Sequence, residues 1–366
     1  MHPANTFPDI HGIDYLELYV SNARQAVHFY RSTLGLIPIA YAGLETGLRD
    51  RTSYVLASGE VRLMLTAPLL PEHPIGAFVA RHGDGVKDIA LRVTDTTEAY
   101  TLALEHGAEP VLPPTVYEDG HGRVVKATIA AYGDVVHSFI ERQDYDGPFL
   151  PGFSPAAVPP ASPATGIIAI DHVVANVELG AMERWVAYYR DILGFAQLLH
   201  FDDREISTEY SALMSKVMQN GSGRIKLPIN EPAEGRRKSQ IAEFLDYFGG
   251  PGVQHIALET NDICATVDAL RAAGIRFITV PPVYYEGLSQ RVGPIDESIA
   301  SLRERHILVD CDEEGYMLQI FSQPLQDRPT LFVEIIQRKG SRGFGKGNFK
   351  ALFEAIEREQ SSRGNL

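Results

Sequence analysis

The sequence contains a long internal repeat, and this repeat constrains the fold more than any other feature. Residues 252–260, GVQHIALET, match residues 85–93, GVKDIALRV, at five of their first seven positions. A second matched pair begins with IDHVVANV at Ile170 and IDYLELYV at Ile13. Both pairs have a similar offset along the chain. A repeat of this length predicts two copies of one architecture joined in a single polypeptide.

Each copy is predicted to contain two smaller units. Around each matched segment, an alternating strand pattern is followed by an amphipathic helical pattern, and short β-rich segments come next. The helical patterns begin at Asn22, Thr96, Gly180 and Ile263. The chain is therefore predicted to have an α+β fold built from four βαβββ modules.

A segment rich in Pro, Ala and Ser divides the two copies, and we expect it to be an extended linker. The predicted organisation is an N-terminal domain (1–145) without a metal site, a linker (146–166) and a C-terminal catalytic domain (167–366). With 366 residues, the chain is long enough for each domain to have its own core.

Charge and cysteine content limit the partners and the compartment. The formal net charge of −14 argues against a nucleic-acid or anionic membrane partner and favours a small-molecule or protein partner. Two cysteines, Cys264 and Cys311, are too few for a disulfide framework or a thiolate metal site.

The N-terminus lacks a signal-peptide pattern, and no stretch approaches the roughly 18–20 apolar residues of a membrane span. We therefore expect a cytoplasmic protein.

The two copies differ in residue type at three matched strand positions. The C-terminal copy carries His172, His255 and Glu334 where the N-terminal copy carries Tyr15, Asp88 and Ser138. Two imidazoles and one carboxylate on three strands are the ligand set of a facial triad, which leaves positions open on Fe(II). We therefore predict a metal site in the C-terminal copy and its loss from the N-terminal copy.

Each predicted ligand also has a purely structural interpretation. A single histidine in an apolar strand is usually an ordinary core or surface residue. A carboxylate inside LFVEII is costly to bury unless it is paired or bound to a metal, and an ion pair to an arginine is the alternative for Glu334. The occurrence of all three at matched repeat positions favours the metal site. The other histidines match no such pattern.

Longer motifs connect the sequence to a known family. They are IDHVVANV (170–177), LPINEP (227–232), KSQI (238–241), GVQHIAL (252–258), GYMLQIF (315–321), QDRPTLFVEIIQR (326–338) and GFGKGNFKALFEAIEREQ (343–360). Duplicated βαβββ modules with these ligands resemble the vicinal oxygen chelate, or glyoxalase-like, superfamily. Within it, the C-terminal copy resembles the 4-hydroxyphenylpyruvate dioxygenase family, and the N-terminal copy does so more loosely. The resemblance implies two open β-barrel domains and a C-terminal lid helix over residues 348–360.

The resemblance also implies an activity. An Fe(II)-dependent dioxygenase of this family converts 4-hydroxyphenylpyruvate and O2 to homogentisate and CO2 in tyrosine catabolism, by oxidative decarboxylation, ring hydroxylation and side-chain migration. His172, His255 and Glu334 are then the iron ligands. The implied substrate-binding residues are Ser211, Asn230, Gln240, Gln254, Gln319, Phe321, Phe332, Asn348 and Phe349. The family further implies a homodimer or homotetramer.

Other functions remain open at this point. 4-Hydroxymandelate synthase shares the substrate and the triad but hydroxylates the benzylic carbon; Asn230 in LPINEP and Phe349 in GNFKALFEA favour ring hydroxylation. A metal-free binding protein is a second alternative, against which the retained triad argues. A glyoxalase-type isomerase or an extradiol dioxygenase is a third. Phe321 and Phe332 are equally compatible with plain core positions.

Overall fold

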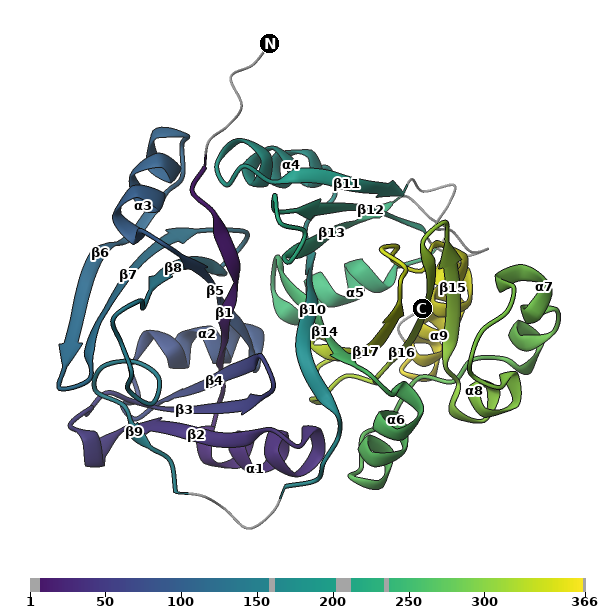
Figure 1. Cartoon of the computed structure of the whole chain (residues 1–366), viewed down its shortest axis with the longest axis horizontal. Coiled ribbons are helices and arrows are strands. Elements are labelled where there is room, and N and C mark those ends of the chain that lie inside the picture. The colour runs from purple at the N-terminus through teal and green to yellow at the C-terminus, as the bar shows by residue number, and fades with distance from the viewer. Residues whose placement is uncertain (1–6, 158–161, 202–211, 234–236, 365–366) are drawn as a thin grey trace.

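The computed structural model describes residues 7–157, 162–201, 212–233 and 237–364. Two curled β-sheets lie beside each other, one from each half of the chain (Figure 1). The strands of the N-terminal sheet are β1 (Ile10–Tyr19), β2 (Ile37–Ala42), β3 (Arg51–Ser58), β4 (Val61–Pro68), β5 (Gly85–Val93), β6 (Pro110–Asp119), β7 (Gly122–Ala130), β8 (Val136–Glu141) and β9 (Ser154–Pro155). Their order across the sheet is β6-β7-β8-β5-β1-β4-β3-β2-β9.

The C-terminal sheet repeats this arrangement. Its strands are β10 (Ile167–Asn176), β11 (Ala196–Phe201), β12 (Ala212–Gln219), β13 (Lys226–Ala233), β14 (Gly252–Thr260), β15 (Leu308–Asp312), β16 (Gly315–Phe321) and β17 (Phe332–Lys339). Their order is β11-β12-β13-β10-β14-β17-β16-β15. In each sheet the first strands of two modules form the central antiparallel pair, β1–β5 or β10–β14. The fold prediction of four βαβββ modules is therefore confirmed.

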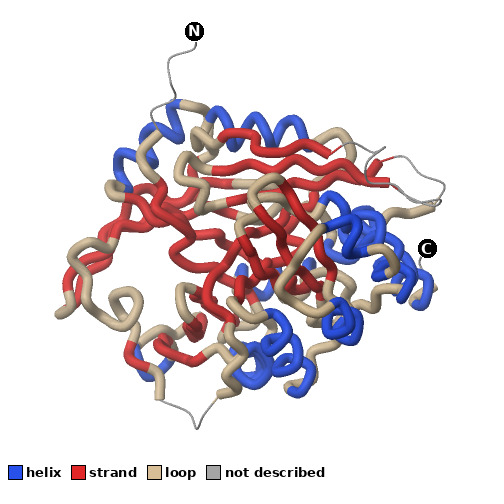
Figure 2. The backbone as a smooth tube through the Cα atoms, turned by 45° about the vertical axis from the view of Figure 1, so that its right-hand side comes forward, coloured by secondary structure: helices blue, strands red, loops and turns tan. Residues whose placement is uncertain are grey.

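Helices lie mainly on the outer faces of the strands (Figure 2). The module helices are α1 (Ala23–Leu34), α3 (Thr96–Glu105), α4 (Met182–Asp191) and α6 (Ile263–Ala272). The others are α2 (Pro74–His82), α5 (Gln240–Phe248), α7 (Leu288–Val292), α8 (Ile299–Arg305) and α9 (Phe349–Ser362), with short 3-10 turns η1 (Leu44–Thr46), η2 (Pro282–Tyr285) and η3 (Lys346–Asn348). Helices α2 and α5 occupy equivalent places before β5 and β14, and the sequence analysis did not predict them.

Caps of ordinary type explain where these helices begin and end. The Ser239 side chain accepts a hydrogen bond from the backbone N–H of Ala242 at the start of α5, and Gly249 ends that helix in the left-handed conformation. Asn22 and Gly35 do the same for α1. Because α5 borders the C-terminal sheet, its capped first turn also fixes the position of Gln240 at the site described below.

The two halves pack closely against each other. Apolar residues of both halves form one continuous core cluster. His137 of β8 is buried at the boundary, where its ring nitrogens lie 3.1 Å from the Ile89 carbonyl oxygen and 2.9 Å from the Tyr189 hydroxyl. Burial lowers the pKa of His137, so its imidazole is neutral in this position. Within the segment 146–166, expected to be a linker, residues 154–155 form β9 and pair with β2.

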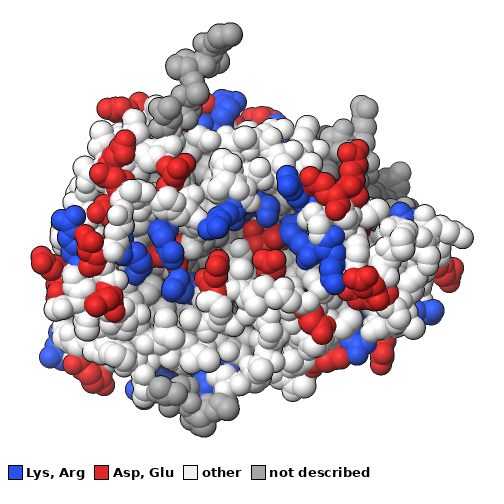
Figure 3. Space-filling model, viewed as in Figure 1, with Lys and Arg blue, Asp and Glu red and all other residues white. Residues whose placement is uncertain are grey.

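The surface shows basic and acidic side chains interspersed across the face seen in Figure 3. In the described part of the chain, no helix has the length and apolar character needed to cross a membrane.

Candidate metal centre and active site

The three predicted ligands lie on three strands that are adjacent in the C-terminal sheet, β10, β14 and β17. His172 and Glu334 are the register partners of Ala257 on either side of β14. His255 lies two residues before Ala257 and therefore shares its face of the strand. The sheet register thus brings the three side chains to one spot, and the small Ala257 between them leaves room.

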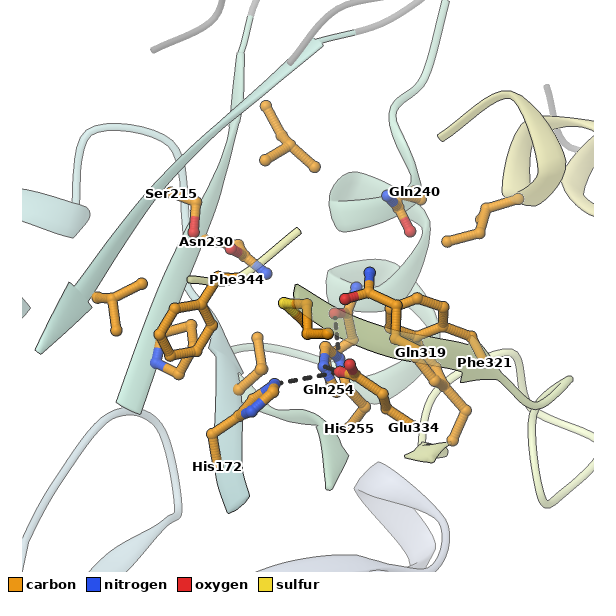
Figure 4. Close-up of a pocket in the computed structure, with 17 residues that line it drawn as sticks. His172, Ser215, Asn230, Gln240, Gln254, His255, Gln319, Phe321, Glu334 and Phe344 are labelled. Atoms are coloured by element: carbon orange, nitrogen blue, oxygen red, sulfur yellow. Dashed lines mark hydrogen bonds and ion pairs between the residues drawn. The ribbon is translucent and has the colours of Figure 1, made fainter. Parts of the chain in front are cut away.

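The ligand atoms converge on a common point (Figure 4). Nε2 of His172 lies 3.1 Å from Oε2 of Glu334, and Nε2 of His255 lies 3.3 Å from the same oxygen. All three side chains are buried, and one ligand atom from each lies within 4.8 Å of the others. No other group of three such residues with this spacing occurs in the described ranges. Two imidazole nitrogens and a carboxylate, without thiolate, suit a divalent transition metal.

Outer partners hold the imidazoles in this orientation. Nδ1 of His172 lies 2.7 Å from Oδ1 of Asp171, and Nδ1 of His255 lies 3.0 Å from Oε1 of Gln254. Because each Nδ1 faces an acceptor, each Nε2 would be free to bind a metal ion at the shared point. Burial acts to raise the pKa of Glu334, but the two histidines outweigh it and lower that pKa below its usual value. Glu334 is therefore an ionised carboxylate.

Asp171 connects the site to the segment that leads into α9. Nε and Nη2 of Arg338 donate to the Asp171 carboxylate at 2.6 and 2.8 Å. Nη1 of Arg338 donates to the carbonyl oxygens of Ser341 and Gly343 at 3.1 and 2.8 Å, and the guanidinium lies 5.5 Å from the Phe344 ring centroid. One arginine thus joins the His172 partner to the loop before α9.

Asp312 holds the same loop from the opposite side. Its Oδ2 accepts hydrogen bonds from the Ser341 hydroxyl at 2.6 Å and from the backbone N–H groups of Arg342 and Gly343, both at 2.9 Å. Burial acts to raise the pKa of Asp312, but these hydrogen bonds prevail and lower it to about 2.

A cavity of about 80 Å³ adjoins the ligand cluster. Its aromatic wall surrounds the histidines: the Phe332 ring stacks on His255 at 4.8 Å between centroids, Phe321 lies edge-on to His255 at 5.9 Å, and Phe344 lies 5.1 Å from His172. Neutral polar groups enter from several elements, namely Ser215, Asn230, Gln240, Gln254 and Gln319 (Figure 4). Ile356 of α9 also contacts the cavity. The arrangement suits a small aromatic molecule that reaches the metal.

Nine of the predicted site residues line this cavity: His172, His255, Glu334, Asn230, Gln240, Gln254, Gln319, Phe321 and Phe332. Asn348 does not line it. Instead, the Tyr284 hydroxyl donates a 2.6 Å hydrogen bond to Asn348 Oδ1 and anchors the base of α9. Ser211 lies outside the described residues. Phe349 begins α9, but its side chain is likewise outside the description.

Sequence reasoning missed several lining residues. They are Val174, Leu213, Ser215, Val217, Pro228, Met317, Phe344 and Ile356. Ser215 is opposite Asn230 in the β12–β13 register, and period-2 alternation places Leu213 and Val217 on its face of β12. The alternation in ALMSKVMQ was therefore an available signal. Phe344 had no such signal, because it reaches His172 from an irregular loop.

Comparisons with known proteins agree with this geometry. Residues 12–134 and 169–320 match the Glyoxalase/Bleomycin resistance protein/Dioxygenase superfamily. The chain is 45% identical to 4-hydroxyphenylpyruvate dioxygenase of Yarrowia lipolytica, with 99% of this chain and 95% of that protein covered. It is 46% identical to the 4-hydroxyphenylpyruvate dioxygenase of Caenorhabditis briggsae, with 96% and 93% covered.

The chain belongs to the 4-hydroxyphenylpyruvate dioxygenase family. Among solved structures, a mutant of 4-hydroxymandelate synthase from Streptomyces coelicolor superimposes with a TM-score of 0.86 at 35% identity, with 96% of this chain and 99% of that chain covered. The duplicated module architecture is therefore shared with a solved relative along almost its whole length. The family assignment made from the sequence motifs is confirmed.

Proposed function

We propose that this protein is an Fe(II)-dependent dioxygenase that converts 4-hydroxyphenylpyruvate and O2 to homogentisate and CO2 in tyrosine catabolism. The observation that carries the proposal is the buried His172, His255 and Glu334 group at the end of a cavity lined by amides and aromatic rings. The relatives named above, 45% and 46% identical over nearly the whole chain, support the same reaction.

The donor set supports iron as the metal. Two neutral imidazoles and one carboxylate leave several positions of an octahedral ion open, as a substrate that chelates through a keto acid requires. When bound, Fe(II) would hold that keto acid and activate dioxygen. Asp171 and Gln254 keep the imidazoles of His172 and His255 turned toward the ion, so their contribution is to binding and orientation.

The cavity wall orients the rest of the substrate. Asn230 and Ser215 face each other across β12 and β13, and Gln240 enters from the first turn of α5. These groups donate and accept hydrogen bonds without adding charge, which suits a phenolic hydroxyl. Phe321 and Phe332, with ring centroids 6.3 Å apart, supply the apolar surface against which an aromatic ring packs.

Helix α9 covers the cavity. Ile356 reaches the cavity, and the end of the helix is fixed to α5 through Arg363, whose Nη2 donates to Glu243 Oε2 at 2.6 Å. The base of the helix is fixed by Asn348 and Tyr284. Such a cover excludes water from a reaction that passes through oxidising species.

Product analysis tests the proposal. The protein is loaded with Fe(II) without oxygen, mixed with 4-hydroxyphenylpyruvate and exposed to air, with Glu334→Gln as the control that keeps the side-chain volume. We expect homogentisate and an equal amount of CO2 from the unaltered protein only. 4-Hydroxymandelate instead would identify the synthase activity that the similarity to that solved enzyme raises. Iron binding without oxygen consumption would refute the substrate assignment.

The homodimer or homotetramer and the cytoplasmic location expected from the sequence remain predictions. Analytical ultracentrifugation of the iron-loaded protein tests the first, and fractionation of cells that express the chain tests the second.

A further inference from the structure

The N-terminal half contains a second cavity at the position that corresponds to the metal site. This N-terminal cavity measures roughly 700 Å³, about ninefold more than the cavity beside the metal ligands. The sheet registers establish the correspondence. Val136 is opposite Asp88 in the N-terminal sheet, as Phe332 is opposite His255 in the C-terminal sheet. Likewise, Ser53 is opposite Thr66, as Ser215 is opposite Asn230. The core-strand residues that line the cavity are Glu17, Tyr19, Ser53, Met64, Lys87, Asp88, Lys126, Thr128 and Val136.

A lysine occupies the position equivalent to a site glutamine. In the β16–β17 pairing, Gln319 is opposite Ile336, two positions away from the pair Phe321–Glu334. In the β7–β8 pairing, Lys126 is opposite Ile140, two positions away from the pair Thr128–Ser138. Lys126 therefore stands where Gln319 stands in the other copy. The change from glutamine to lysine places a cation beside Tyr15 and Asp88, two of the three positions that match the predicted metal ligands.

The Lys126 ammonium is the centre of a hydrogen-bonded cluster. Its Nζ lies 2.8 Å from the Tyr15 hydroxyl and 3.1 Å from Asp88 Oδ2, and that same oxygen accepts a 2.6 Å hydrogen bond from the Ser138 hydroxyl. Tyr15, Asp88 and Ser138 are the three residues at the metal-ligand positions. The lysine ammonium thus connects the side chains that occupy the positions of the predicted metal ligands.

The charge of this cluster is set by its surroundings. Burial acts to lower the pKa of Lys126, but the hydrogen bond to the Tyr15 hydroxyl and the nearby Asp88 carboxylate hold it well above its ordinary value, so the ammonium stays charged. Burial raises the pKa of Tyr15, which therefore keeps its proton. An ammonium has three N–H donors. Within the described part of the chain two are used, which leaves one for a molecule in the cavity that Lys126 lines.

The cavity wall has a net positive charge in a chain whose net charge is −14. Arg51, Lys87 and Lys126 contribute three positive charges, against which Glu17 and Asp88 set at most two negative ones. Burial raises the pKa of Glu17 and lowers that of Lys87, which reduces the charge on both side chains. The remaining wall is largely apolar, with Leu48, Ile75, Leu112, Leu150 and Phe153. A volume of this size lies in the range of small-molecule sites, about 300–1,000 Å³.

A purely structural replacement of the metal would be expected to fill the space that the metal and its ligand left. Here the opposite occurs: the aromatic rings of Phe321 and Phe332 are replaced by Thr128 and Val136, and the cavity is enlarged.

We propose that the N-terminal half binds a small organic monocarboxylate in this cavity, with its carboxylate on the Lys126 ammonium and its apolar part against the surrounding wall. The inference rests on the N-terminal residues and does not depend on the proposed function of the C-terminal site.

Equilibrium dialysis of the iron-loaded protein without oxygen tests this, with phenylacetate as the probe and neutral phenylacetamide as its matched control. Val136→Phe introduces the ring that Phe332 has at the equivalent position, and so narrows the cavity beside Asp88 without changing any charged group. Val116→Phe, at a 56% exposed position outside the cavity, is the matched control. We expect Val136→Phe to abolish one component of phenylacetate binding that Val116→Phe retains.

Lys126→Met separates charge recognition from packing. We expect it to weaken that component for phenylacetate by roughly tenfold or more, the usual effect of losing a hydrogen bond to a charged group, and to leave phenylacetamide binding nearly unchanged. Equal binding of phenylacetate by the unaltered protein and by Val136→Phe would overturn the proposal. An equal loss of acid and amide in a folded Lys126→Met variant would also overturn it.

Discussion

Replacement of Asp171 by asparagine separates the effect of this residue on the metal from its effect on the fold. The Asp171 side chain is 3% exposed and the Arg338 side chain 12%, so the pair is buried. Removing one charge of a buried pair costs about 3–5 kcal/mol of unfolding free energy. Asp171 also holds His172, and the loss of such an outer partner weakens metal affinity by roughly 10–100-fold.

These two effects differ in how they respond to metal. A metal present at 1,000 times its dissociation constant adds about 4.1 kcal/mol to the free energy of unfolding. If Asp171→Asn weakens affinity 100-fold, the same metal concentration is only about ten times the dissociation constant and adds about 1.4 kcal/mol. We therefore expect the metal-dependent increment to fall by about 2.7 kcal/mol at the upper limit.

The repeat supplies a matched control, because Asp14 stands at the same position of the N-terminal half. Asp14 is also buried and pairs with Arg142 and Arg92. Its neighbour in the sequence is Tyr15 rather than a metal-ligand histidine. Asp14→Asn should therefore lower stability by a similar amount and leave the metal increment unchanged.

Urea unfolding without oxygen, with and without Fe(II), measures both quantities for each variant. If the two variants lose the same metal-dependent increment, or if neither loses any, the role assigned to Asp171 as the support of His172 is refuted.

Three further outcomes follow from the site. Glu334→Gln should reduce metal affinity, measured by dialysis, by more than the roughly 10–100-fold of an outer partner; retention of native affinity would contradict the ligand assignment. Asp312 has a pKa of about 2 in the folded protein, below its ordinary value. Its contribution to the free energy of unfolding is therefore complete above about pH 4 and is lost as the pH falls toward 2. The difference in unfolding free energy between the native protein and Asp312→Asn should shrink from pH 7 to pH 3. Gly345 has φ 75°, and a Cβ there would lie 2.7 Å from the Gln319 amide; Gly345→Ala should lower kcat/KM and stability, whereas Gly274→Ala, with φ 98° and open space, should lower stability alone.

The clustering of His172, His255 and Glu334 was predictable because the repeat singles out these three positions. His172, His255 and Glu334 are each unremarkable in their own strands, and only the comparison with Tyr15, Asp88 and Ser138 distinguishes them. Strand periodicity then places the ligands on one face of each strand. The order of the modules, with β10, β14 and β17 adjacent, follows from the βαβββ pattern once it is recognised.

Other parts of the site depend on contacts that no local pattern encodes. Phe344 reaches His172 because Arg338 and Asp312 hold the loop before α9. Asp312 lies far from this loop in the sequence, and Arg338 is itself held by the still more distant Asp171. Asn348 was predicted to bind substrate, yet it does not line the cavity, and its side-chain oxygen accepts a hydrogen bond from the Tyr284 hydroxyl. Helices α2 and α5 are short, so their periodic patterns are weak signals until they pack on each other through Phe78 and Phe244.

Because Lys126 is the cation of the N-terminal cluster, only the C-terminal half would depend on a supply of metal ions. An ammonium group is made with the chain, is insensitive to chelators and is not oxidised by air, whereas the C-terminal cluster must obtain its cation from the surroundings. During synthesis, the half that emerges first therefore needs nothing but its own sequence to neutralise Asp88.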